Sequence, residues 1–211
     1  MRRAARVSTG FRSRGRVRYG WVMPHLTPTR EFSAETEAKG SRFIAHLIPM
    51  AEWEARLADL AAEHRKASHI CTATREVAPD NSVLERARDD GEPGGTAGRP
   101  ILAALAGADV VAAGVAVVRY FGGTKLGTGG LARAYGGAAA EVLSLASLTE
   151  WHRIGSGVLR AGFADASALE QVIAGLPLTV VDRTYTEDGT VLKVEGPEAV
   201  LNDPVLGEWM R

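Results

Sequence analysis

The sequence has very little cysteine and few aromatic residues, and each shortage excludes a class of protein. Cys71 is the single cysteine among 211 residues, so the chain has no internal disulfide and no cysteine cluster for zinc. Aromatic residues make up 6% of the chain, whereas 45% of it is hydrophobic and 24% charged, as in an ordinary globular protein. The composition excludes collagen-like and wholly disordered chains and predicts a cytoplasmic location.

Long hydrophobic runs are also missing. The longest, Val110–Val118, is far shorter than the roughly 20 residues that a membrane-spanning helix needs. Arg2 and Arg3 resemble the start of a twin-arginine export signal, but no apolar segment follows them. We therefore expect no association with a membrane.

Acidic residues are absent from the first 30 positions, which hold eight arginines. The remaining residues carry 17 basic and 25 acidic groups, a net charge of −8, although the whole chain sums to zero. Residues 1–30 show no hydrophobic periodicity and predict a flexible, Arg-rich arm. Three interpretations stay open: an organellar presequence, an RNA-binding tail, or an artefact of an upstream start codon, since the sequence from Met23 resembles the start of a folded protein.

From Ser41 onward, hydrophobic periodicity predicts alternating strands and helices. The predicted strands cover residues 41–48, 68–73 and 114–121. The predicted helices cover residues 51–64, a segment that begins at 99, and 131–147, and the segments 75–100 and 122–130 are predicted loops.

A second pattern starts after Trp151 and predicts a strand, a helix and two further strands. The last two strands are joined by Glu187-Asp188-Gly189, because Asp-Gly tolerates the positive φ of a tight hairpin. This β-α-β-β order is three quarters of a ferredoxin-like unit. Its second helix and fourth strand are compressed into residues 197–211, which predicts either an abbreviated or a truncated domain.

Glycine is concentrated between residues 89 and 137, which hold 13 of the 24 glycines. Two blocks stand out, DDGEPGGTAGRPIL (89–102) and VVRYFGGTKLGTGGLARAYGGAA (117–139). The second block predicts a strand, a glycine loop and a helix, an order that points backbone N–H groups and the helix dipole at an anion such as a phosphate. The predicted anion- or RNA-binding residues are Arg119, Gly122, Gly123, Thr124, Lys125, Gly127, Gly129, Gly130 and Arg133.

Other interpretations of these blocks stay open. The Walker pattern is absent, and the context of a dinucleotide-binding loop is not met. The glycines also fit close packing of loop against helix, with Arg119 and Lys125 paired to a supporting acidic loop of Asp89, Asp90 and Glu92. Those three acids could instead hold Mg²⁺, although caps and ion pairs to arginine are commoner.

A catalytic pair is not favoured by the pattern. His69 and Cys71 share a face of a predicted strand, but two residues of separation is poor geometry for proton transfer, so Cys71 is interpreted as a buried thiol. We predict no catalytic residue, no metal site and no cofactor.

Four motifs in order resemble the IMPACT/YigZ family: Lys39-Gly40-Ser41-Arg42-Phe43-Ile44, Ala67-Ser68-His69, and the two glycine blocks. The resemblance implies an α+β chain with an IMPACT N-terminal domain at 31–148, like domain two of ribosomal protein S-five. It also implies a small ferredoxin-like domain at 151–211, akin to domain V of elongation factor G. Gly94 stands where the family pattern has serine, and the arm has no counterpart in it.

The family resemblance implies a non-enzymatic regulator of translation that binds RNA, the ribosome or a translation-regulating protein. The alternative is an enzyme or switch that binds a nucleotide or another phosphate ligand at the glycine loop, with Asp90 and Glu92 holding a metal. A third interpretation is a protein-interaction module that uses the acidic surface. Because the body after the arm is acidic, any anion site in it must be local. The sequence predicts no particular oligomeric state.

Overall fold

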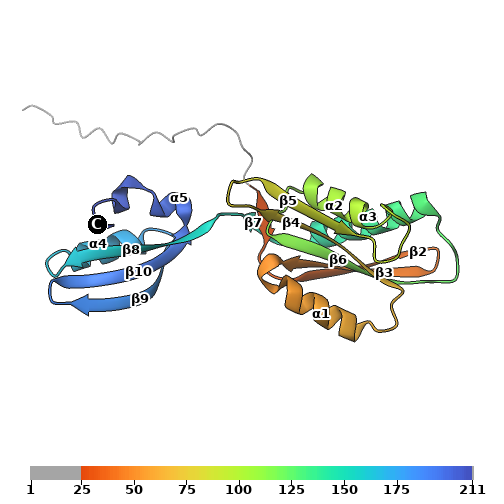
Figure 1. Ribbon diagram of the computed structural model, residues 1–211, viewed down its shortest axis with the longest axis horizontal. Helices are drawn as coiled ribbons and strands as arrows, with labels where there is room; N and C mark the ends of the chain where they lie inside the picture. Colours follow the sequence, from red (N-terminus) through yellow and green to blue (C-terminus); the bar gives the residue numbers. More distant parts are fainter. Residues whose placement is uncertain (1–24, 211) are drawn as a thin grey trace, which may run out of the picture.

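The computed structural model describes residues 25–210, which form two lobes joined by a short linker (Figure 1). The N lobe covers residues 25–150 and the C lobe residues 154–210. Both lobes combine helices with an antiparallel sheet, which agrees with the mixed helix-and-sheet class that the sequence predicts. In the described part of the chain, no helix is long and apolar enough to cross a membrane.

The N lobe is built on a five-stranded antiparallel sheet with the order β2-β3-β6-β4-β5. The bounds of its strands are β2 Phe32–Ala38, β3 Ser41–Pro49, β4 His69–Val77, β5 Val83–Arg88 and β6 Ala113–Tyr120. The helices are α1 Trp53–Glu63, preceded by a 3-10 turn at Met50–Glu52, α2 Gly98–Gly107 and α3 Thr128–Leu145. Helices α2 and α3 cover one face of the sheet, and α1 lies on the other (Figure 1).

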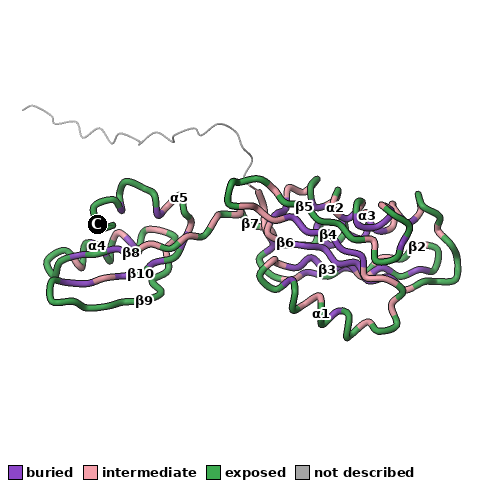
Figure 2. The backbone as a smooth tube through the Cα atoms, viewed as in Figure 1, coloured by how far each residue is buried: buried purple, intermediate pink, exposed green. Residues whose placement is uncertain are grey.

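Two hydrophobic clusters hold the helices on the sheet. On the α3 face, Phe43 of β3 packs edge-on against the ring of Tyr135, with 5.1 Å between ring centroids. On the α1 face, Ile48 packs with Trp53 and Leu60. The central strands are buried along most of their length, as Figure 2 shows for β3, β4 and β6. This burial explains why the apolar runs at 41–48 and 114–121 predict these strands correctly.

A glycine in β6 allows α1 to approach the sheet. A Cβ atom placed on Gly114 would lie 2.4 Å from the ring of Trp53, closer than any real contact. The indole therefore rests directly on the backbone of the strand, and this contact positions α1.

The structure corrects two predictions near polar segments. Val83–Arg88, predicted as loop, is strand β5, which pairs with β4. Five of its six residues are exposed, because β5 is an edge strand with one neighbour and little of it enters the core. Leu26–Pro28, placed by the sequence in the flexible arm, forms strand β1 and pairs with β7, Leu148–Glu150. The rest of the predicted arm, residues 1–24, lies outside the described residues.

The C lobe follows the predicted β-α-β-β order. Its elements are β8 Ile154–Gly162, α4 Ala166–Ala174, β9 Thr179–Thr186, β10 Gly189–Pro197, α5 Glu198–Leu201 and a 3-10 turn at Pro204–Leu206. Strand β10 lies between β8 and β9 and is antiparallel to both, the arrangement of a split β-α-β unit. Up to residue 210 no fourth strand joins this sheet, so the ferredoxin-like assignment stays a prediction.

We predict that Gly114→Ala lowers the free energy of unfolding by about 2 kcal/mol, because the new methyl group overlaps the Trp53 ring and α1 must shift. Urea denaturation followed by circular dichroism measures the change. Gly107→Ala, near the end of α2, is the matched control: nothing lies within 4 Å of its added methyl group, and the helix gains up to about 1 kcal/mol. Equal effects at the two positions would contradict the packing described.

Candidate functional site

The loops that carry the sequence motifs meet at one end of the N-lobe sheet, which we call the loop end. They are the β2–β3 turn at 39–40, the α1–β4 loop at 64–68, the β5–α2 loop at 89–97 and the β6–α3 loop at 121–127. A Cβ atom on Gly122 would lie 1.9 Å from the carbonyl carbon of Gly40, so the turn packs directly on the loop. Gly122 thus serves close packing, one of the interpretations that the sequence leaves open.

A buried ion pair between Glu92 and Arg119 lies beneath these loops. The two residues are 8% and 5% exposed. Tyr135 of α3 donates a hydrogen bond from its hydroxyl to Glu92 Oε1 at 2.7 Å, and Arg119 donates to Ser41 Oγ at 3.5 Å. Gly122 N–H donates to the same Ser41 oxygen at 3.2 Å. The pair therefore joins the β5–α2 loop to β3, β6 and α3.

Asp89 organises the start of α2. Its carboxylate accepts hydrogen bonds from the N–H groups of Gly95, Ala97 and Gly98 at 2.7, 2.9 and 2.8 Å. Burial alone would raise the pKa of Asp89, but these donors outweigh it and hold the pKa below its ordinary value. The carboxylate replaces the side-chain cap that Ala97, at the N-cap position of α2, does not provide.

Asp90, His69 and Cys71, which lie near Asp89, also form hydrogen bonds within the protein. Asp90 Oδ2 accepts from Ile70 N–H at 2.7 Å, and His69 Nδ1 donates to the Asp90 carbonyl at 2.6 Å. The thiol of Cys71 donates to the Asp89 carbonyl at 3.0 Å, and burial raises the pKa of Cys71 to about 12. Such a thiol is a poor nucleophile at neutral pH.

The acidic loop therefore bonds to protein donors, as the interpretation of caps and arginine pairs expects. No cluster of three or more potential metal-ligating side chains occurs in residues 25–210. Arg119, predicted to bind an anion, instead turns inward to Glu92 and has little surface to offer a ligand.

Six exposed basic side chains surround the loop end, and none forms an ion pair with a described residue. We call this set the basic rim: Lys39, Arg65, Lys66, Arg99, Lys125 and Arg133. Lys125 and Arg133 belong to the predicted anion site. Lys39 belongs to the first family-like motif and lies outside the predicted site, and its position beside the glycine loop depends on the Gly40–Gly122 contact.

The first turn of α3 faces this rim. Its N-cap is Gly127, with φ of 71° and no side-chain cap, so the first N–H groups of the helix lack a capping acceptor. A groove of about 470 Å³ runs beside it between α3 and β2, lined by Lys39, Leu126, Gly130 and Arg133 among others. The Arg133 guanidinium lies 3.6 Å from the Cβ position of Gly129, near the helix start.

The predicted glycine loop thus stands as an exposed segment between two packed elements. Gly123, Thr124 and Gly129 are exposed there, and Phe121 at its start is 50% exposed. Helix α3 begins at Thr128, three residues before the predicted start, so Gly129 and Gly130 belong to its first turn.

We predict that Arg119→Met lowers the free energy of unfolding by about 3–5 kcal/mol, because it leaves the buried Glu92 carboxylate without its partner. Chemical denaturation provides the measurement. Arg99→Met removes an exposed arginine of the same rim and changes stability by less than about 0.5 kcal/mol. A loss below 1 kcal/mol for Arg119→Met would show that the pair is not structural.

The lowered pKa of Asp89 predicts an acid-dependent loss of stability. A carboxyl with a depressed folded pKa stabilises the fold above its ordinary pKa of 3.8 and loses this contribution as the pH falls through the folded value. Asp89→Asn weakens the three N–H contacts and lowers stability by about 1–3 kcal/mol at pH 7. Thermal unfolding of both proteins between pH 7 and pH 2 should show their stabilities converging at low pH; a constant gap would contradict the ionised cap.

Known proteins resemble this chain in sequence and in structure. The family model described as the Impact N-terminal domain matches residues 39–143, which include all four loops. "IMPACT family member YigZ" of Escherichia coli is 45% identical over 121 residues, which are 56% of this chain and 59% of that protein. "IMPACT family member in pol 5'region" of Thermus thermophilus is 51% identical over 171 residues, or 79% of this chain and 89% of that protein.

The match to the Escherichia coli protein spans less than two thirds of that relative's length, and so does a 42% match to a Haemophilus influenzae family member, at 60%. A solved structure titled "Crystal structure of an hypothetical protein" shares 34% identity and a TM-score of 0.62, over 84% of this chain and 88% of the other. The family motifs, the matched domain and the extent of the Thermus match agree, and the chain belongs to the IMPACT family.

Proposed function

We propose that the basic rim binds the phosphate groups of RNA and that the protein acts in translation as a non-enzymatic binding protein. The observation that carries the proposal is the uncapped N-terminus of α3, flanked by Lys125 and Arg133. Unsatisfied N–H groups and the positive end of the helix dipole favour an anion at this point.

The rim adds charges that can follow a phosphate backbone. Lys39 and Arg133 line the groove beside α3, and Lys125 lies in the loop before it. Phe121, half exposed at the start of the loop, offers a ring on which a base can stack. This combination of cations and one aromatic side chain suits single-stranded RNA more than a rigid duplex.

The distribution of charge explains how an acidic body can hold RNA. Asp89 and Glu92 direct their carboxylates to internal N–H, hydroxyl and guanidinium donors, so the rim cations face solvent without those acids as partners. The net charge of −8 after residue 30 disfavours binding elsewhere on the body. We expect the affinity to be local to the loop end and to weaken with salt.

The translation role rests on the family resemblance of the loop-end motifs, together with the non-catalytic character of the site. Cys71 is buried with a raised pKa, and the acids of the loop are bonded to the protein. With this role we propose a cytoplasmic location and the finer fold assignments, an S-five-like layer in the N lobe and a ferredoxin-like C lobe.

Anisotropy of a short fluorescein-labelled single-stranded RNA tests the proposal, with the full chain and with a chain shortened to residues 23–211. The shortened chain retains binding, and its affinity falls between roughly 50 and 200 mM salt. Lys125→Ala with Arg133→Ala weakens binding and reduces the slope of log K against log salt by about 1.4, the value for two phosphate contacts on a single strand.

A matched control removes two cations from the C lobe, Arg160→Ala with Lys193→Ala, both exposed and far from the loops in the fold. This variant keeps the affinity and the salt slope of the parent. Loss of binding on removal of residues 1–22, or equal losses in the two double variants, would refute a site at the loop end. A thermal shift with a mononucleotide but none with RNA would instead support the phosphate-ligand alternative.

A further inference from the structure

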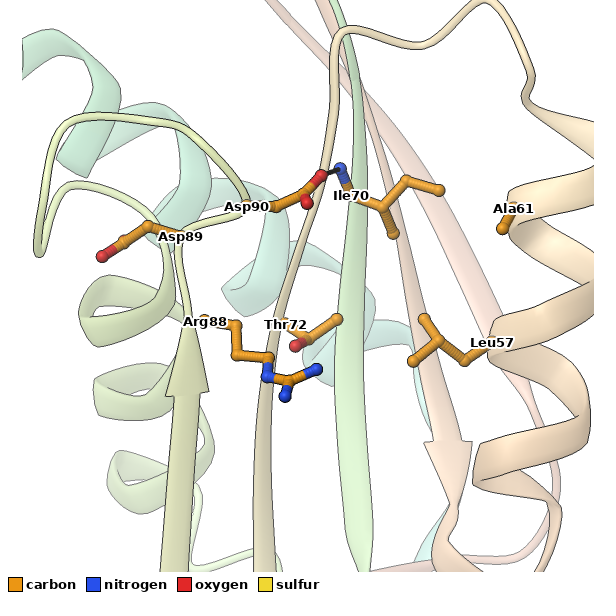
Figure 3. Close-up of a pocket in the computed structure, with 7 residues that line it drawn as sticks. All are labelled: Leu57, Ala61, Ile70, Thr72, Arg88, Asp89 and Asp90. Carbon is orange, nitrogen blue, oxygen red and sulfur yellow. Dashed lines mark hydrogen bonds between the residues drawn. The ribbon is translucent and has the colours of Figure 1, made fainter.

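A second concave site lies on the opposite face of the N-lobe sheet from α3. Helix α1 packs on β3 and β6, and the part of that face formed by β4 and β5 has no helix over it (Figure 1). A pocket of about 620 Å³ opens there between α1 and β5 (Figure 3). Its lining residues are Leu57, Ala61, Ile70, Thr72, Arg88, Asp89 and Asp90.

One side of the pocket is apolar. Leu57 and Ala61 project from α1, one turn apart, and Ile70 faces them from β4 (Figure 3). Leu57 and Ile70 also pack against the cluster formed by Ile48 and Trp53, so this wall is fixed by the core beneath it. Such a wall suits a compact hydrocarbon or aromatic group.

The other side carries one cation and one hydroxyl group. Arg88 is directly opposite Thr72 in the β4–β5 register, so both side chains lie on the pocket face of the sheet. Arg88 forms no ion pair within residues 25–210, whereas Arg86, two residues earlier on the same face, pairs with Glu76. An exposed arginine beside a hydroxyl on a concave surface is suited to an organic anion.

The first pocket adjoins a second pocket of about 540 Å³. The second pocket shares Leu57, Thr72 and Arg88 with the first and is also lined by Thr74. Thr74 is 6% exposed, and its hydroxyl has no hydrogen-bond partner among the described residues. A buried hydroxyl without a partner is uncommon and costs free energy unless something satisfies it. We call the two adjoining pockets together the trough, and both Thr74 and Arg88 line it.

The two acids at the rim of the pocket form no ion pair with Arg88. Asp89 points away from the pocket in Figure 3, toward the N–H donors at the start of α2. Asp90 directs one oxygen to Ile70 N–H, as the dashed line in Figure 3 shows. Arg88 is therefore the cation of the first pocket that has no ion-pair partner among the described residues, and the neighbouring pocket is also lined by Glu54 and by the paired Arg86 and Glu76.

We infer that this trough binds a small organic monoanion with a compact apolar body, such as a carboxylate or sulfonate carried on a hydrocarbon or aromatic group. The acid group lies at Arg88 and accepts hydrogen bonds from the Thr72 and Thr74 hydroxyls, and the apolar body lies on Leu57, Ala61 and Ile70. The volume is within the range of small-molecule sites. The trough adjoins the loop end through Asp89 and Asp90 of the β5–α2 loop, but its cation, Arg88, is not part of the basic rim.

The test uses the full chain and 8-anilinonaphthalene-1-sulfonate, an aromatic monoanion whose fluorescence rises in apolar surroundings. Arg88→Gln weakens its binding by about tenfold, because the charge-assisted contact is lost. Arg160→Gln removes an exposed arginine of the C lobe, outside both the trough and the basic rim, and leaves the dissociation constant within about twofold of the parent. Circular dichroism verifies that each variant is folded.

Two further measurements separate the site from general hydrophobic binding. Octanoate displaces the probe at a concentration about tenfold lower than neutral octan-1-ol does, since Arg88 contributes to the acid alone. Thr74→Val weakens the probe several-fold while it raises the midpoint of thermal unfolding, because the unpaired hydroxyl is removed. Equal probe affinity in Arg88→Gln and the parent, or equal competition by the acid and the alcohol, would overturn the inference.

Discussion

The buried ion pair of Glu92 and Arg119 is the interaction on which the loop end depends. It joins a loop between β5 and α2 to the end of β6, and through Tyr135 and Ser41 it includes α3 and β3. Burying two charges carries a large desolvation cost, which the ion pair and the additional hydrogen bonds offset. The pair therefore holds the β5–α2 loop against β3, β6 and α3, the elements that flank the glycine loop.

The acidic and basic side chains of the loop end point in different directions. The carboxylates of Asp89 and Glu92 are directed inward to protein donors, and the rim cations Lys39, Lys125 and Arg133 remain on the surface. A chain whose body carries a net charge of −8 thus has one region that can attract a phosphate backbone. The glycines contribute in two ways, since Gly122 permits the Gly40 contact and Gly127 leaves α3 without a side-chain cap.

Sequence patterns predicted the elements whose residues enter the core. Local hydrophobic periodicity is enough to predict β3, β6 and α1. Strand β5 is a polar edge strand and has no such pattern. The sequence predicts Arg119 at the anion site because it adjoins the glycine loop, but only the fold shows that Glu92 is its partner. The positions of Lys39 and Arg88 depend on contacts between segments far apart in the chain, which no local sequence pattern reveals.

The central claim is that the start of α3 and the loop before it form the anion site. Two-dimensional ¹H–¹⁵N NMR of the chain, titrated with a short single-stranded RNA, tests this claim most directly. We expect saturable shifts of the backbone amides of Lys125, Gly127, Thr128 and Gly129, with the amides of β8 to β10 unchanged. Shifts confined to the C lobe, or to residues 1–24, would contradict it.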